Sequence, residues 1–276
     1  FMLAAVLNEI QNGPVSREYA KFAASLRPTD TLATFNWDTL LDRALWETGR
    51  WSPADGYGMS FRAIYDEGWK PAAVASAGPS AIRLLKLHGS TNWLVPYSTI
   101  HLTTLRPHTT YESLDPSNPP LFAFARSSGK YPTYRGRGRA GYEPFAYCYY
   151  PPDLPLVMDA PAGHQTIRTV SAADLPEHGQ TEVGPGAVPA MPFIVPPIRE
   201  KDYDLFGSAL KPLWTQLTQG IEHCEQLFVV GYSFPTTDLR PREMLKEAIS
   251  RRHRPLPVTV VNPFPDSAVA SLVAAG

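Results

Sequence analysis

The sequence predicts an α/β fold, with a Rossmann-like parallel sheet that carries helices on both faces and is interrupted by a Pro-rich, loop-rich insert. Four short runs are predominantly apolar, which is typical of parallel strands buried on both faces. More than half of the 29 prolines lie between Pro96 and Pro197, where helical periodicity disappears. A chain of 276 residues with 43% hydrophobic content is large enough for such a domain.

Helix and strand patterns alternate in the first third of the chain. Helical stretches are expected at about 2–11 and 16–26, followed by a strand at Thr31–Phe35. Leucine and alanine then recur at helical spacing over about 40–48, and Gly49 is the expected end of that helix. This order predicts a strand, a turn and a helix.

Three further apolar runs predict the other strands of the sheet. Ile82–Leu87 ends abruptly at His88, and the last third of the chain contributes Gln226–Val230 and Pro257–Val261. Each run is followed by turn residues and then by a helical pattern or a loop.

The Pro-rich segment divides the predicted domain. We expect 1–94 and 199–276 to form two parts of one sheet, and 95–198 to be an inserted module. Within the insert, Phe145–Tyr150 and Phe193–Val195 are candidate edge strands, because proline excludes most central strands.

Charge and cysteine content narrow the range of partners. Lys and Arg total 25 against 26 for Asp and Glu, so the long-range field that attracts nucleic acid is lacking. Cys148 and Cys224 are the only cysteines, which excludes a disulfide framework and a four-cysteine zinc site and fits a reducing cytoplasm. No run of apolar residues approaches the length of a membrane span.

Ligands of open parallel sheets bind at the carboxyl ends of the strands. The polar residues at the predicted ends are Asn36, Asp38, His88, Ser233, Asp238 and Asn262. We expect these side chains to border one crevice.

Each of these residues also has a purely structural interpretation. Asp38 and Asp238 suit helix N-caps, and Asn36 and Asn262 suit turns in which the side chain bonds nearby backbone. His88 can be satisfied by a backbone carbonyl, although its place at the end of an apolar run is unusual for a core histidine. Their occurrence together favours a functional site.

Four strings resemble, in order, motifs of the sirtuin family, and most closely those of divergent bacterial sirtuin-like domains. The strings are Ala33-Thr-Phe-Asn-Trp-Asp38, Lys86-Leu-His-Gly89, Val229-Val-Gly-Tyr-Ser-Phe-Pro235 and Val260-Val-Asn-Pro263. The resemblance covers both flanks and leaves 95–198 unmatched.

The resemblance implies an NAD site. In that family the first motif lines the nicotinamide-ribose pocket, the histidine is the general base, and the last two motifs hold the adenosine half. Carried over, the site residues are Thr34, Asn36 and Asp38 beside the reacting ribose, His88 as the base, Gly231 and Ser233 at phosphate or ribose, and Asn262 at the adenine ribose.

The sequence departs from the family before the first motif. Sirtuins begin with a strand and a Gly-Ala-Gly-x-Ser loop that holds the diphosphate, and we hypothesise that this segment lies upstream of Phe1. Without it, we expect the chain not to bind NAD tightly. The G-x-G-x-x-G string at 136–141 lacks the flanking strand and helix that give this motif meaning.

The insert also lacks the zinc-binding cysteines of the deacylating sirtuins, so no zinc is expected. This difference favours hydrolysis of NAD by water over transfer to an acyl group, as in bacterial antiphage-defence proteins of the family. A protein deacylase and a non-catalytic NAD or ADP-ribose sensor remain the alternatives. A further domain on the parent chain and a homo-oligomer are candidate partners.

Overall fold

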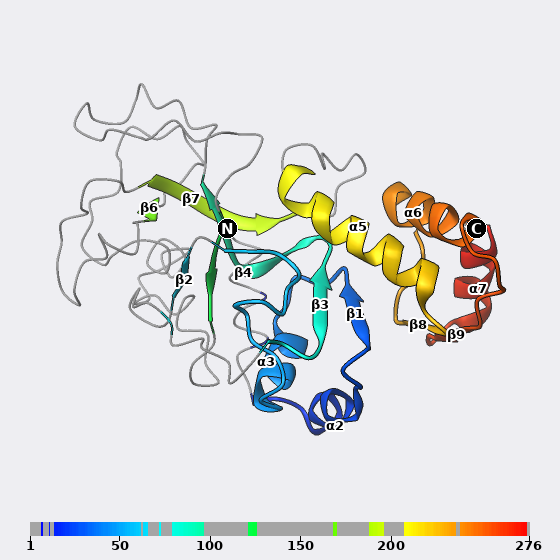
Figure 1. The fold of residues 1–276 in the computed structure, drawn as a ribbon, viewed down its shortest axis with the longest axis horizontal. Helices are drawn as coiled ribbons and strands as arrows, with labels where there is room; N and C mark the ends of the chain where they lie inside the picture. Colours follow the sequence, from blue (N-terminus) through cyan, green and yellow to red (C-terminus); the bar gives the residue numbers. More distant parts are fainter. Residues whose placement is uncertain are drawn as a thin grey trace. The chain divides into compact units, whose positions relative to one another are not determined.

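The computed structural model forms two compact units, Phe1–Ile194 and Val195–Gly276, which are described separately (Figure 1). The structure describes residues 7, 11, 14–61, 63–65, 72, 79–96, 121–125, 168–169, 188–195, 207–235 and 238–274.

The first unit contains, among its described residues, a parallel pair of strands and two short helices, one before and one after the first strand. Its elements here are α2 (Arg17–Ser25), β1 (Thr31–Thr34), α3 (Leu40–Glu47) and β3 (Arg83–Lys86). β1 and β3 run in register from Thr31 opposite Arg83 to Thr34 opposite Lys86. Both strands lie where the sequence predicts them.

Local chemistry explains where these helices begin and end. The Ser16 hydroxyl accepts a hydrogen bond from the Tyr19 amide at 3.2 Å and caps α2. Gly49 follows α3 with a φ of 69°, a conformation that glycine adopts without steric cost. The predicted end of this helix is therefore confirmed.

A second sheet, mostly antiparallel, occupies the rest of the first unit. Its strands, in spatial order, are β2 (Ala63–Tyr65), β5 (Phe122–Phe124), β4 (Gly89–Pro96), β7 (Val188–Ile194) and β6 (Arg168–Thr169). β4 starts immediately after His88 and pairs with both β5 and β7. The segment that follows His88 is therefore joined directly to strands of the Pro-rich region.

Phe193, expected on an edge strand, belongs to β7, which lies between β4 and β6. Phe193 itself is less central than the place of β7 in the strand order suggests. β6 pairs only with Val188 and Pro189, so Phe193 lies beyond the end of β6. Phe145–Tyr150 lies outside the described residues.

Gly89 permits the close approach of β4 and β7. Its φ is 78°, and a Cβ at this position would lie 2.0 Å from the carbonyl oxygen of Phe193. The turn after His88 therefore requires a residue without a side chain.

The core of the first unit is rich in aromatic side chains. Trp93 is fully buried, meets Tyr57 edge-on with ring centroids 4.9 Å apart, and stacks on Phe193 at 6.1 Å. Tyr57 also meets Trp51 edge-on at 4.9 Å. These contacts assign Trp93 to the core.

The described residues of the second unit form two parallel strands and three helices. They are α5 (Gly207–His223), β8 (Leu227–Val230), α6 (Leu239–Ser250), β9 (Val258–Val261) and α7 (Pro265–Val273). β8 and β9 pair in register from Leu227 opposite Val258, α5 packs against α6, and α7 contacts β9. Both strands lie where the sequence predicts them, but the expected burial on both faces is wrong here, because Phe228 and Val230 of β8 are 60% and 68% exposed.

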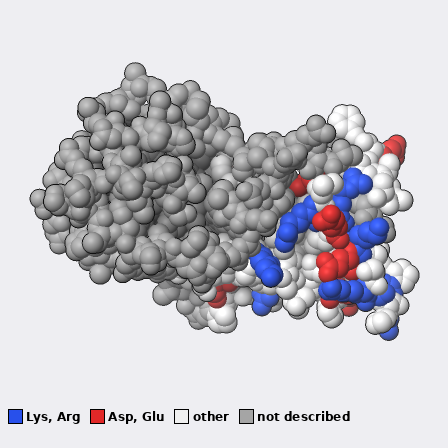
Figure 2. Space-filling view, turned by 90° about the horizontal axis from the view of Figure 1, so that it is seen from above, with Lys and Arg blue, Asp and Glu red and all other residues white. Residues whose placement is uncertain are grey.

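Basic and acidic side chains are intermixed over the described part of the face shown in Figure 2. Arg251 illustrates this pattern, because its guanidinium pairs with Glu222 at 2.9 Å and with Glu247. In the described part of the chain, no helix has the length and hydropathy to cross a membrane.

The mixed helices and strands agree with an α/β class. The four strands predicted for the sheet pair as β1 with β3 and β8 with β9, so the single Rossmann-like sheet stays a prediction. The boundaries of the predicted domains, 1–94, 95–198 and 199–276, also stay predictions.

Candidate functional site

The residues that follow β1 and β3 lie side by side. The Leu87 amide donates to the Thr34 carbonyl at 3.0 Å, which extends the strand pairing by one bond. The rings of Phe35 and His88 come next, with centroids 5.0 Å apart. His88 is 5% exposed, so this histidine is buried against its neighbours at the end of the strand pair.

The loop between β1 and α3 holds the other predicted residues of the first unit. The Asp38 carboxylate accepts from the Leu40 amide at 3.0 Å, but the N-cap residue of α3 is Thr39, so the interpretation of Asp38 as the N-cap is wrong. The Asn36 side chain is exposed, and the backbone N–H of Asn36 donates to the Thr34 hydroxyl at 3.1 Å. The structure thus brings Thr34, Asn36, Asp38 and His88 into two adjoining segments.

Electrostatics link Asp38 to α2. Burial raises the pKa of the Tyr19 phenol, and the negative charge of Asp38 adds to this effect. Asp38 therefore acts on a neighbouring phenol in addition to bonding the backbone of α3.

Two sets of hydrogen bonds join this loop to the segment that carries His88. The Trp37 carbonyl accepts from the Thr91 amide at 2.9 Å and from the Thr91 hydroxyl at 3.1 Å. The Asp38 carbonyl accepts from the Lys86 ammonium. His88 lies between Lys86 and Thr91 in sequence, so the anchors bracket it.

A buried ion pair lies behind the loop. Lys86 and Asp42 approach to 3.1 Å, with side chains 0% and 5% exposed. The Tyr57 hydroxyl also donates to Asp42. Burial raises the pKa of Asp42, while the charge of Lys86 and the bond from Tyr57 act in the opposite direction.

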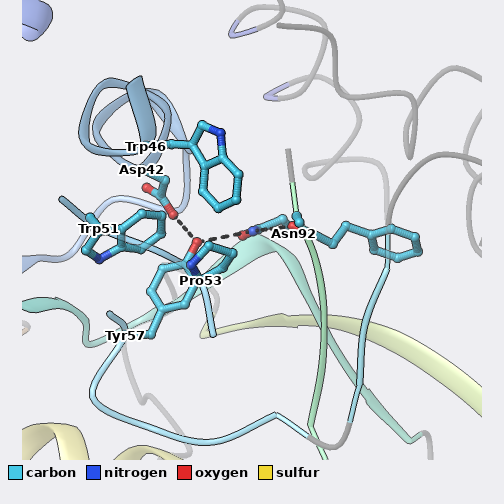
Figure 3. A pocket seen from close by; sticks show the side chains of 8 residues that line it. Asp42, Trp46, Trp51, Pro53, Tyr57 and Asn92 are labelled. Carbon is cyan, nitrogen blue, oxygen red and sulfur yellow. Dashed lines mark hydrogen bonds between the residues drawn. The ribbon is translucent and has the colours of Figure 1, made fainter. Parts of the chain in front are cut away.

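Figure 3 shows how Asp42 is linked through Tyr57 to Asn92 of β4. The Asn92 amide donates to the Tyr57 oxygen at 3.3 Å and to the Phe124 carbonyl at 2.9 Å, and its oxygen accepts from the Ser90 hydroxyl at 2.6 Å. The cavity beside these groups measures about 10 Å³, the room that one ordered water needs. Its lining comprises Asp42, Trp46, Trp51, Pro53, Tyr57, Asn92, Phe124 and Ala125.

The sequence prediction missed Lys86 and Asp42, although both carry a signal. Lys86 interrupts an apolar run with a charge close to its end, where a parallel strand is buried on both faces. Asp42 lies one turn after Asp38 and next to Leu41 in an amphipathic helix. A charge in each of two buried patterns predicts a buried pair.

The second unit places Gly231 and Asn262 at neighbouring strand ends. Gly231 follows β8 with a φ of 71°, and its amide donates to the Val261 carbonyl at 2.9 Å. The Asn262 oxygen accepts from the Phe264 amide at 2.8 Å, so the turn interpretation of Asn262 is confirmed. Ser233 is exposed.

Asp238 is the N-cap residue of α6, as one interpretation predicts, but its side chain makes no capping bond. Its carboxylate instead accepts from the Tyr232 hydroxyl at 2.8 Å, and the Tyr232 ring packs on Phe234 at 4.7 Å. Asp238 therefore holds the loop after β8.

The polar groups of the first unit combine a histidine, a carboxylate and an amide, which suits proton transfer and the stabilisation of positive charge. Within the described residues, no group of three His, Cys, Asp or Glu side chains is placed to hold a metal ion. The 136–141 string lies outside those residues. No family model matches the chain, and no curated protein or solved structure matches it.

Proposed function

We propose that the protein is a sirtuin-like NAD hydrolase that releases nicotinamide and ADP-ribose. The observation that supports this proposal most is the contact of the His88 ring with Phe35, at 5.0 Å. This contact places a histidine beside the loop of Asn36 and Asp38 at the carboxyl ends of two parallel strands.

The chemistry of NAD suits these groups. The nicotinamide nitrogen is cationic, so its bond to ribose breaks without a general acid and leaves an oxocarbenium-like sugar. The carboxylate of Asp38 would stabilise that positive charge, and the exposed amide of Asn36 would orient the ribose. His88 would take a proton from the attacking water, since a neutral imidazole has a basic ring nitrogen.

The resemblance assigns the adenosine half of NAD to the second unit, at Gly231, Ser233 and Asn262. Gly231 and Asn262 follow adjacent parallel strands, which supports this assignment. The Gly231 amide already donates to Val261. Contact with phosphate at Gly231 would therefore involve its Cα surface, and a donor would come from elsewhere, such as the Ser233 hydroxyl.

Nicotinamide release from NAD by the full-length protein tests this proposal. With NAD alone, we expect release by the wild type and a loss of about a hundredfold or more in His88→Ala and Asn36→Ala. His253→Ala is the matched control, because His253 is exposed in the second unit.

Two other outcomes would replace the proposal. Release that requires an acylated peptide would identify a protein deacylase. Binding of NAD without release, with or without such a peptide, would identify a sensor.

A further inference from the structure

We propose that Lys86 and Asp42 form a positioning pair, which fixes the loop of Asn36 and Asp38 against the segment that carries His88. Lys86 donates to the backbone of this loop, and Asp42 is a residue of α3. Neither residue is among those that the resemblance assigns to NAD. Its predicted effect on catalysis rests on the proposed function, whereas its effect on the loop does not.

The hydrogen bonds of Lys86 define the position of the loop. The ammonium has three N–H donors, and its acceptors are the two Asp42 carboxylate oxygens, at 3.3 and 3.1 Å, and the Asp38 carbonyl. A fully buried ammonium is stable only when it is paired and hydrogen-bonded. Movement of the Asp38 carbonyl would therefore remove one of the acceptors that Lys86 needs.

The positions of Lys86 and Asp42 in the chain show which segments their hydrogen bonds connect. Lys86 lies opposite Thr34 in the β1–β3 register and two residues before His88. Asp42 follows Asp38 by one helical turn. The pair thus connects the strand before His88 to the loop and to the helix that follows it.

Asp42 accepts a hydrogen bond from a second donor, the Tyr57 hydroxyl. Tyr57 donates to Asp42, Asn92 donates to Tyr57 at 3.3 Å, and Ser90 donates to the Asn92 oxygen at 2.6 Å, as Figure 3 shows in part. Ser90 and Asn92 belong to β4, directly after His88. The network therefore begins before His88, passes through α3 and returns to the strand after His88.

An apolar pair of similar volume would fill the same space, and such replacements of buried ion pairs are often neutral or stabilising. Stability alone therefore does not explain why the two charges occupy this site. The charges provide directional bonds, which set the carbonyl of Asp38 in one place.

The test compares Lys86→Met, Asp42→Asn and the double variant with Leu84→Ala, in the full-length protein. Leu84 is fully buried on β3 and provides a variant that loses core packing without losing this network. Melting temperature, kcat and KM for NAD cleavage, and amide hydrogen exchange of peptides covering 34–39 and 87–92 are measured for each variant at a temperature where all are folded.

We expect Lys86→Met to lower kcat about tenfold or more with KM within about threefold, because misplacement of reacting groups affects chemistry more than binding. Exchange at 34–39 should rise about tenfold. The double variant should recover melting temperature, since no unpaired charge remains, and still show the loss in kcat. Leu84→Ala should keep kcat within about twofold after comparable destabilisation.

Recovery of kcat together with melting temperature in the double variant would overturn the proposal, as would an equal loss of kcat in Leu84→Ala. If Lys86→Met does not fold, Asp42→Asn provides the same comparison, because it keeps the shape of the side chain. If the wild type does not cleave NAD, the proposed function fails and the exchange data decide the positioning role. Unchanged exchange at 34–39 in both single variants would then exclude it.

Discussion

The rings of Phe35 and His88 lie with centroids 5.0 Å apart and planes tilted by 53°. The first residue after β1 thus packs on the second residue after β3. Lys86 and Thr91 also donate hydrogen bonds to the loop between β1 and α3. Together with the ring contact, these bonds limit the orientations open to the imidazole.

Replacing Phe35 tests whether this ring orients His88. We expect Phe35→Ala to lower kcat for NAD cleavage about tenfold, since a general base must lie within hydrogen-bonding reach of its proton. Phe22→Ala removes a phenylalanine that is 44% exposed on α2 and should leave kcat unchanged. Equal kcat values in the two variants would show that Phe35 does not position the histidine.

Gly89→Ala tests the close approach of the turn after His88 to β7. The left-handed backbone and the 2.0 Å approach to the Phe193 oxygen should together cost about 3 kcal/mol or more of unfolding free energy. Gly49→Ala is the control, because Gly49 has a φ of 69° but no atom within 4 Å of its added Cβ, and it should cost about 1 kcal/mol. Similar denaturation midpoints for both variants would contradict the crowding at Gly89.

Asp42 predicts a pH dependence of stability. Burial, the largest cause, raises the pKa of Asp42 above the ordinary value of 3.8, so the folded chain binds this proton more tightly than the unfolded chain. The resulting contribution to stability is complete below pH 3.8 and is lost as the pH rises through the folded pKa.

Urea unfolding of wild type and Asp42→Asn, measured at a series of pH values from below 3.8 upwards, isolates the contribution of the Asp42 carboxyl to stability. The stability of the wild type relative to Asp42→Asn should decrease as the pH rises, because the asparagine cannot titrate. A relative stability that increases with pH would show that the Lys86 charge outweighs burial at this site.

Arg252 predicts a stabilising role within the second unit. Its guanidinium donates to the carbonyls of Ile221, Glu222 and Cys224 at the end of α5, the last two at 2.9 Å. Arg252→Ala should lower the free energy of unfolding by about 2 kcal/mol, because these helix-end carbonyls lose a charged donor. Arg254→Ala, at an exposed side chain, should change it by less than about 0.5 kcal/mol, and equal losses would contradict the capping role.

The strands β1, β3, β8 and β9 could be predicted because their signals are local. Each of the four is a short apolar run bounded by turn residues, and Gly49 ends α3 in the conformation that glycine favours. The position of Phe193 in β7 depends on pairing with β4, nearly a hundred residues away, and a local pattern carries no information about such a partner.

The site was predictable to a similar extent. Position at a strand end identified His88 and Asp38, and the structure shows the segments that carry them side by side. Sequence did not show that Asp42 reaches Lys86, because 44 residues separate them and the bond depends on packing α3 behind the strand pair. The alternative roles of Asp238 were likewise decided by a side-chain partner, Tyr232.

NAD binding and NAD cleavage measured on the same His88→Ala protein test the central claim most directly. If His88 is the base, the initial rate of nicotinamide release should fall about a hundredfold or more, while the Kd for NAD stays within about threefold of the wild type. Release by His88→Ala at the wild-type rate would contradict the account.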